Sequence, residues 1–212
     1  MHPVRVRLHT RGTGGKMILP ADRQRIGTGR KGAGVSFHHL AIATRDLEAT
    51  HRFYSEAMGF ELVNVDVIPY MEHGWARHAF YDTGNGEMFA VWDIHDAGLP
   101  DFDPALSRGL GLPTFVNHIA FAAADLDEID AFRDRWLSLG HDVVRVDHGW
   151  CVSIYADDPS GTMVEWCTTV RAFTDHDRRL AMERLRAADP AVDTTPPPIE
   201  FFVASEYQPA PA

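Results

Sequence analysis

The sequence predicts an α+β protein made of two βαβββ modules, and three repeated features support this fold class. Each of two segments opens with a histidine, His39 or His118, followed by small and apolar residues. An Asp-Leu pair comes seven residues after each histidine, at Asp46 and Asp125, where a helix should begin. Three apolar segments separated by turn residues then follow each helix. One such module leaves a sheet face uncovered, so we expect the two modules to pair into a curved mixed sheet that forms a cleft.

In the first module, the alternation of residues over 37–44 predicts a strand with His39 and the small residues after it on one face. Asp46 should cap a helix that ends at Gly59, because an Asp side chain accepts hydrogen bonds from free backbone amides. An Asn-Gly pair before the last segment is typical of a hairpin turn. The three strands predicted after this helix cover 60–68, 76–82 and 87–93.

The second module repeats this order after a long linker, 95–113, that is rich in Gly, Pro and Asp. A strand over 117–123 places His118 on the same face as the small residues that alternate with it. A helix over 125–138 has apolar residues at core spacing and ends at Gly140. The predicted strands that follow lie near 142–146, 150–156 and 162–168.

The chain divides into three parts by composition. Residues 1–35 are basic and rich in Gly and Arg, and we expect a poorly ordered leader there. The two-module domain should span 36–170, with modules at 36–94 and 115–170. Residues 171–212 predict a C-terminal helix and an extended, proline-rich tail.

The charge and the apolar content exclude several classes of function. The formal net charge is −10, and the body after the basic leader is more acidic still, which argues against a nucleic-acid-binding surface. No segment has the apolar length of a membrane span, and no secretory signal is evident. Cys151 and Cys167 fall in predicted strands without metal-binding spacing, so we expect buried free thiols. We therefore expect a cytoplasmic protein that binds neither membranes nor nucleic acids.

Three residues are candidates for a metal site: His39, His118 and Glu165. If the modules pair about a pseudo-twofold axis, the two histidines should approach the cleft from opposite sides. Glu165 lies on the last predicted strand between apolar neighbours, where a carboxylate is costly unless it is paired or bound to a cation. Counting from the turn glycines, the first module has Ala90 at the corresponding position. Two histidines and one carboxylate with open positions suit non-haem Fe(II), while Mn, Ni, Co or Zn remain alternatives.

The segments 38–60, 117–118 and 158–165 resemble the modules of the vicinal oxygen chelate superfamily. This superfamily includes glyoxalase I, type I extradiol dioxygenases, fosfomycin-resistance enzymes and bleomycin-binding proteins. The resemblance covers roughly residues 36 to 170. It implies the paired-module fold, a divalent metal, a small-molecule substrate and association into a homodimer.

Within the superfamily, the ligand pattern is most similar to that of the extradiol dioxygenases. The resemblance implies that Tyr155, ten residues before Glu165, donates a hydrogen bond to a metal-bound substrate oxygen. It also implies that His148 accepts a proton, although the match there is looser. A further family histidine on the last strand of the first module has no counterpart, because Glu87 and Met88 occupy that region.

Three classes of function follow from this comparison. The first is an Fe(II)-dependent dioxygenase of the ring-cleaving type that acts on a catecholic or other vicinal-oxygen substrate. The second is a redox-neutral metalloenzyme, either a glyoxalase-like lyase or a fosfomycin-type transferase. The third is a binding protein of the bleomycin-resistance kind. The sequence places the dioxygenase only modestly ahead of the other two.

Overall fold

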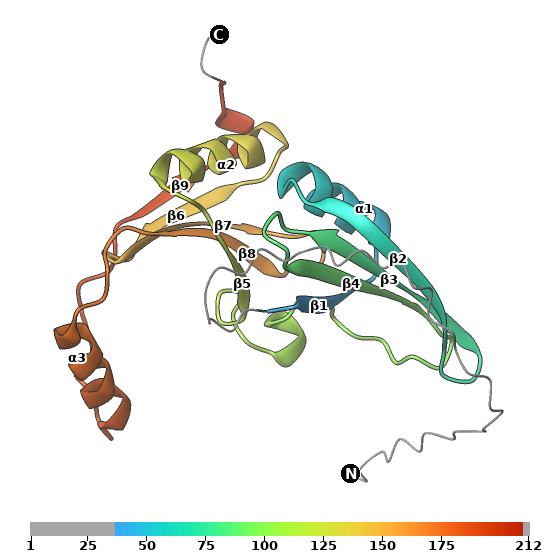
Figure 1. The fold of residues 1–212 in the computed structure, drawn as a ribbon, viewed down its shortest axis with the longest axis horizontal. Helices are drawn as coiled ribbons and strands as arrows, with labels where there is room; N and C mark the ends of the chain where they lie inside the picture. Colours follow the sequence, from blue (N-terminus) through green and yellow to red (C-terminus); the bar gives the residue numbers. More distant parts are fainter. Residues whose placement is uncertain (1–36, 210–212) are drawn as a thin grey trace, which may run out of the picture. The chain divides into compact units, whose positions relative to one another are not determined.

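The computed structural model describes residues 37–209, and the predicted leader at 1–35 lies outside them. The predicted order of elements is confirmed in both modules, as Figure 1 shows. None of the described helices is both long and apolar enough to span a membrane. In the first module, the elements are β1 (His39–Thr44), α1 (Leu47–Arg52), β2 (Glu61–Tyr70), β3 (Gly74–Asp82) and β4 (Met88–His95). In the second, they are β5 (His118–Ala122), α2 (Leu126–Ser138), β6 (Val143–Asp147), β7 (Cys151–Asp157) and β8 (Met163–Thr169).

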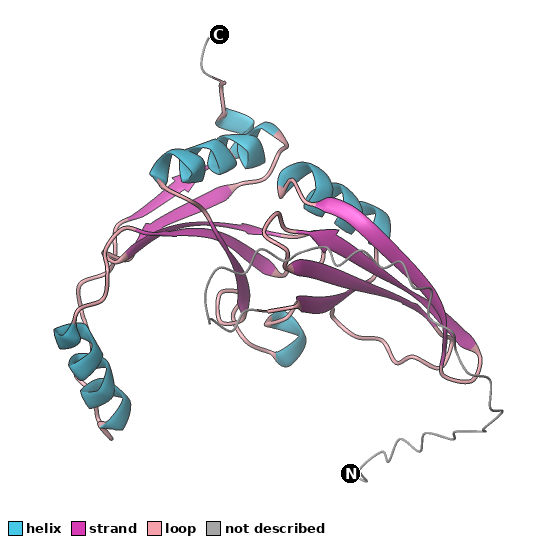
Figure 2. Ribbon diagram, in the orientation of Figure 1, coloured by secondary structure: helices cyan, strands magenta, loops and turns pink. Residues whose placement is uncertain are grey.

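The strands form two mixed sheets, shown in magenta in Figure 2. The first sheet has the order β1-β4-β3-β2, and the second has the order β5-β8-β7-β6-β9. In each sheet, the first strand of the module is parallel to the last, and the other pairs are antiparallel. The duplicated topology predicted from the repeated sequence is therefore present.

The C-terminal tail differs from the prediction, because part of it is a strand. After α3 (Asp175–Arg186), residues Ile199–Phe202 form β9 and pair antiparallel with β6. The apolar residues of β9 gain a sheet edge and a packing surface there. Phe202 packs against the core, and the Arg133 guanidinium lies 5.1 Å from the centre of its ring. The extended tail that we expected is therefore folded onto the second module along these residues.

Both predicted helix caps are present. The Asp46 carboxylate accepts a hydrogen bond from the Ala49 amide at 2.9 Å, and the Asp125 carboxylate accepts one from the Glu128 amide at 3.0 Å. The first helix is short because α1 continues as a single π-helical turn and ends before Gly59, whose φ of +77° suits glycine. α1 therefore covers less of its sheet than the 13-residue α2 covers of the other.

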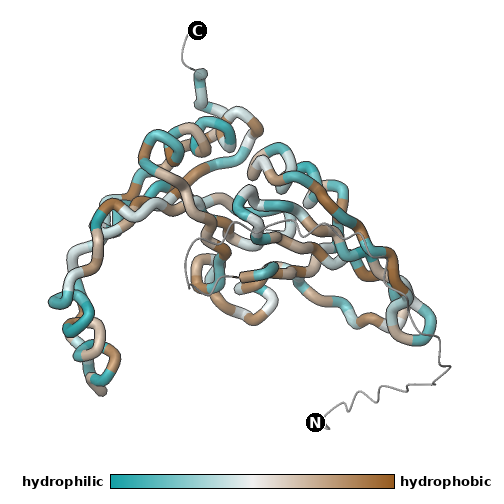
Figure 3. The backbone as a smooth tube through the Cα atoms, viewed as in Figure 1, coloured by the Kyte–Doolittle hydropathy of each residue, from teal (hydrophilic) through white to brown (hydrophobic). Residues whose placement is uncertain are grey.

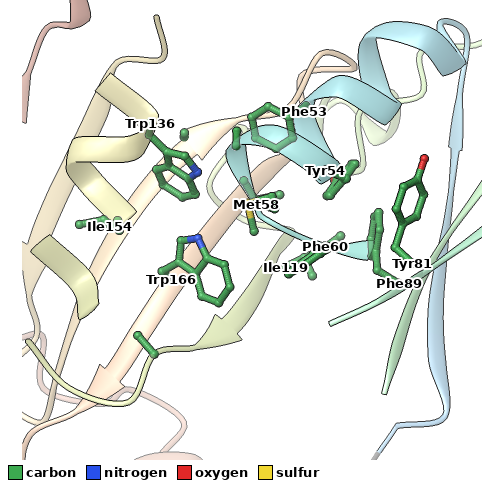
Figure 4. Close-up of a cluster of buried hydrophobic side chains, with 14 of the residues drawn as sticks. Phe53, Tyr54, Met58, Phe60, Tyr81, Phe89, Ile119, Trp136, Ile154 and Trp166 are labelled. Carbon is green, nitrogen blue, oxygen red and sulfur yellow. The ribbon is translucent and has the colours of Figure 1, made fainter. Parts of the chain in front are cut away.

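One hydrophobic core joins the two modules, and Figure 4 shows part of it. Phe60 follows α1, and its ring centre lies 5.0 Å from that of Phe121 on β5 and 6.0 Å from that of Trp166 on β8. A buried polar contact also crosses between the modules, because the Tyr54 hydroxyl donates to Asp158 at 3.0 Å. These contacts make the described domain one packed body.

Each sheet has one face under its helix and one face opposite, which we call the site face. Tyr54 packs 4.2 Å from Phe89 on the helix side of the first sheet, whereas His39 contacts Phe80 on its site face. On the second sheet, Phe132 of α2 stacks on Trp166, and Glu165 therefore points to the site face. Hydrophobic and polar residues are interspersed along β2, as the colours in Figure 3 illustrate.

Candidate functional site

Strand register relates the candidate ligands of the two modules. His39 pairs with Met88 across β1 and β4, and His118 pairs with Met163 across β5 and β8. Two residues further along, Ala90 and Glu165 therefore occupy equivalent positions. Ala90 is fully buried, so the first module supplies no carboxylate at this position. The sequence prediction that Ala90 is the counterpart of Glu165 in the first module is confirmed.

His118 and Glu165 form a close pair on the site face of the second sheet. Their Nε2 and Oε2 atoms lie 2.9 Å apart. Glu165 is only 5% exposed, while the His118 side chain is 35% exposed. The carboxylate is thus held deep in the sheet, and the imidazole reaches it from the more accessible edge strand.

The second nitrogen of His118 restricts what can lie between this pair. Its Nδ1 is 2.9 Å from the carbonyl oxygen of Phe115, which only accepts hydrogen bonds, so Nδ1 carries a proton. In a neutral imidazole Nε2 is then unprotonated and would face the Glu165 carboxylate as a second acceptor. The arrangement needs either a proton between Nε2 and the carboxyl group, carried by one of them, or a cation shared by both atoms. A histidine that donates its other N–H to a backbone carbonyl is typical of metal ligands.

The spacing of the pair also fits a shared ion. Two ligands at about 2.1 Å from one ion, at a right angle, are separated by about 3 Å. The observed separation of 2.9 Å agrees with this value. His118 and Glu165 therefore fit two neighbouring positions of a divalent metal.

Tyr155 and His148 lie next to this pair. Tyr155 is directly opposite Glu165 in the antiparallel register of β7 and β8, and its ring centre is 6.0 Å from that of His118. The Tyr155 hydroxyl is 3.1 Å from Nε2 of His148. Burial, reinforced by the Glu165 carboxylate, raises the pKa of Tyr155 to about 12. Tyr155 is therefore a protonated donor at neutral pH, with a proton acceptor within hydrogen-bond distance.

His39 lies in different surroundings, on the site face of the first sheet. Its Nδ1 is 2.8 Å from Nδ1 of His38, so His38 does not point away as the alternation of the strand predicts. Its ring also contacts Phe80 and lies 6.2 Å, between centres, from that of His78. Within residues 37–209, no group of three or more His, Cys, Asp or Glu side chains is placed to hold a metal. The structure thus brings together four of the five predicted site residues and does not bring His39 to them.

Sequence reasoning missed His78, which had no partner in the repeat. His78 stacks on Trp92 with ring centres 3.9 Å apart, and its Nε2 is buried without a hydrogen-bond partner among the described residues. Burial lowers the pKa of His78, and neighbouring His39 lowers it further. In the sequence, the one indication is that His78 lies two residues before Phe80 on β3. Alternation therefore places both residues on the face that carries His39.

A comparison with protein families identifies this architecture. The sequence model of the Glyoxalase/Bleomycin resistance protein/Dioxygenase superfamily matches residues 36–166, more than half of the chain. The chain belongs to this superfamily. The match ends just past Glu165 and includes both modules, whereas α3 and β9 lie outside it. No curated protein matches the chain significantly.

Solved structures with the same fold include proteins of several kinds. A lactoylglutathione lyase from Agrobacterium tumefaciens is 22% identical, with a TM-score of 0.44, over 65% of this chain and 96% of its own. A superfamily domain from Frankia sp. EAN1pec is 18% identical, with a TM-score of 0.47, over 65% and 98%. The fosfomycin resistance protein FosX from Listeria monocytogenes is 19% identical, with a TM-score of 0.43, over 69% and 98%. At these levels of identity the similarity concerns the fold.

Proposed function

We propose that this superfamily member is a metal-dependent dioxygenase that acts on a small catecholic or vicinal-oxygen substrate, with Fe(II) as its metal. The observation that carries the proposal is the Tyr155–His148 hydrogen bond beside the His118–Glu165 pair. Resemblance to the extradiol dioxygenases implies this neighbourhood of two ligands, a hydroxyl donor and a proton acceptor. Ala90 removes the fourth protein ligand of the glyoxalase-type arrangement, which favours a three-ligand site with room for substrate.

The side chains have distinct tasks in this proposal. His118 and Glu165 hold the metal, which when bound acidifies a chelated hydroxyl and supplies the electronic route to dioxygen. His148 accepts the proton that the substrate hydroxyl releases. Tyr155 then directs its hydroxyl at the substrate oxygen, where negative charge develops. Since its pKa is about 12, Tyr155 remains a donor throughout the pH range of such a reaction.

We propose further that a second copy of the chain supplies the third ligand, His39. His39 and the His118–Glu165 pair lie on the site faces of different sheets, and no three-ligand group forms within residues 37–209. A symmetric dimer that stacks the first module of one copy on the second module of its partner would join them twice. It would also cover apolar side chains that β6 and β9 leave on the site face, including Phe201, which is 75% exposed.

Mixing two inactive variants tests this arrangement. His39→Ala and Glu165→Ala proteins are mixed, unfolded and refolded together, and then loaded anaerobically with Fe(II). If the site is shared between copies, half of the molecules are mixed dimers with one intact site, and about a quarter of wild-type oxygen uptake with catechol returns. If each site lies within one chain, no activity returns. Bound iron, measured by mass spectrometry, should follow the same proportions.

The same preparations separate the other two classes of function. Turnover with Ni(II), Co(II) or Mn(II) in the absence of oxygen would assign a redox-neutral lyase or transferase in place of the dioxygenase. Wild-type protein that holds no stoichiometric metal, yet binds a small molecule tightly, would assign the binding-protein class. A fosfomycin-type transferase would additionally need a thiol or water co-substrate.

A further inference from the structure

A pocket of about 610 Å³ lies on the helix side of the first sheet, on the face opposite His39. It is lined by the first part of α1 and by side chains of β2, β3 and β4. Its volume is within the range of small-molecule sites. The polar residues that matter most in its lining are Arg45, His51, Arg77, Tyr81, Asp93 and His95.

An ordered polar cluster forms one wall of this pocket. Asp93 is 6% exposed, and its Oδ2 accepts hydrogen bonds from Arg77 Nε and His95 Nε2, both at 2.8 Å. The His95 ring stacks on Trp75 with ring centres 3.9 Å apart. Arg77 and His95 are thereby fixed, although their side chains remain 38% and 41% exposed. The buried carboxylate holds an arginine and a histidine at the edge of the pocket.

The duplicated module shows that the fold does not need this cluster. Arg77 pairs with Asp93 in the register of β3 and β4, and the equivalent pair on β7 and β8 is Val152 and Thr168. Val152 and Thr168 are both buried, under the longer α2. A buried ion pair contributes little stability over well-packed apolar residues. The polar cluster is therefore specific to the module that has the open pocket.

The remaining lining indicates the chemistry of a ligand. Arg45 donates through Nη2 to Asp101 and through Nε to the Phe102 carbonyl. Within residues 37–209, Nη1 of Arg45 and Nη1 of Arg77 have no hydrogen-bond partner. The His51 Nδ1 atom is held by Tyr81 at 3.2 Å, which leaves Nε2 for the pocket. Leu62, Val65 and Ala79 supply an apolar wall. Guanidinium groups beside an apolar wall match a carboxylate that carries a hydrocarbon body.

We propose that this pocket is a second ligand site, independent of the proposed metal centre, and that it binds small organic carboxylates. Arg77 receives the carboxylate, Arg45 contributes a further donor, and Nε2 of His51 contributes another when Nδ1 accepts from the Tyr81 hydroxyl. The hydrocarbon body lies on the apolar wall. The acidic groups of the lining do not oppose this, because Asp93 is neutralised by its partners, Asp46 caps α1 and Glu48 pairs with Arg52.

Calorimetric titration of the full chain with phenylacetate, in the presence of EDTA, tests the proposal. Saturable binding is expected, with phenylacetamide at least about tenfold weaker because it lacks the charge. The double variant Arg77→Val/Asp93→Thr copies the buried pair of the second module, so it keeps the net charge and leaves no unpaired carboxylate. It should bind phenylacetate at least about tenfold more weakly than wild type.

Two control variants locate the binding. Arg179→Ala removes an exposed arginine of α3 that is outside the pocket lining, and His118→Ala disrupts only the proposed metal centre; both should bind phenylacetate within about twofold of wild type. The proposal is overturned if the double variant binds as wild type does, if phenylacetamide binds equally well, or if no saturation occurs. A double variant that fails to associate, where wild type forms a dimer, would instead assign the pocket to a second copy of the chain.

Discussion

At the scale of single residues, Asp158 is the polar group that ties the modules together. It is 5% exposed and accepts hydrogen bonds from the amides of Ser160 and Thr162 and from the Tyr54 hydroxyl, 104 residues away in sequence. Burial nevertheless raises the pKa of the Asp158 carboxyl above its usual 3.8, and the bonds it accepts only partly oppose this. The charged form is therefore less favoured in the folded protein than in the unfolded chain.

This shift predicts how stability depends on pH. Because the folded-state pKa exceeds the unfolded one, Asp158 contributes stability at low pH that is lost as the pH rises through the folded-state pKa. In Asp158→Asn this loss should be absent, so the free energy of unfolding of wild type should fall relative to the variant as the pH rises above about 4. Urea unfolding at several pH values measures it, and parallel profiles would contradict the assignment. Asp158→Ala, which leaves three donors unpaired, should cost about 1–3 kcal/mol at any of these pH values.

The candidate site shows what single residues in a sequence can and cannot predict. Glu165, Tyr155 and His118 lie on neighbouring strands of one module, so the register of that module alone brings them together. Alternation and spacing indicated His118 and Glu165, whereas Tyr155 was implied only by the resemblance to the extradiol dioxygenases. His148 lies in the turn just before β7, close to Tyr155 on that strand. His39 depends on how two modules or two copies are arranged, which local periodicity does not encode. The Arg77–Asp93 cluster was missed because neither residue has a like counterpart in the second repeat.

At the scale of elements, the strand β9 is the clearest addition to the sequence prediction. Its four residues are too few, and too close to a proline-rich stretch, to be distinguished from an extended tail by alternation. Its pairing with β6 decides its structure, since an otherwise exposed edge becomes an inner strand. Phe202, Ala204 and Tyr207 then pack against the core. The spacing of apolar residues along α2 did not indicate that the C-terminal tail contributes to this packing.

Removing β9 should therefore weaken the second module. A chain that ends at Pro198 loses the strand and the side chains after it, and its free energy of unfolding should drop by at least about 2 kcal/mol. A chain that ends at Gln208 keeps β9 and serves as the matched control. Chemical unfolding followed by circular dichroism compares them, with soluble aggregate measured by light scattering because β6 becomes an edge. Equal stability of the two truncated chains would show that β9 contributes nothing.

At the scale of the whole molecule, the two modules share one core and are not independent domains. Phe60 is 5% exposed and packs against residues of the opposite module. The linker at 95–113 suggests a boundary between the modules from sequence. This boundary separates two repeated topologies but not two hydrophobic cores. The repeated pattern predicted both modules, whereas the contacts between them depend on aromatic side chains with no counterpart in the repeat.

A shared core predicts a single unfolding transition. Phe60→Ala should lower the free energy of unfolding by about 3–5 kcal/mol, because it opens a cavity where the modules meet. Tryptophan fluorescence and circular dichroism should still report coincident transitions with an unchanged dependence on urea. Leu185→Ala, on a helix residue that is 78% exposed, is the control and should leave the midpoint unchanged. Two separated transitions in wild type would show that the modules fold independently.

The position of β9 also sets an order of events during biosynthesis. The first sheet uses only strands up to His95, so it can close while later segments are still being translated. The second sheet acquires its outer strand from Ile199–Phe202, which follow every other strand of the domain. Until the ribosome has released those residues, β6 stays open to pairing with other nascent chains, and the interval between the synthesis of β6 and that of β9 is when this protein is most exposed to misassembly.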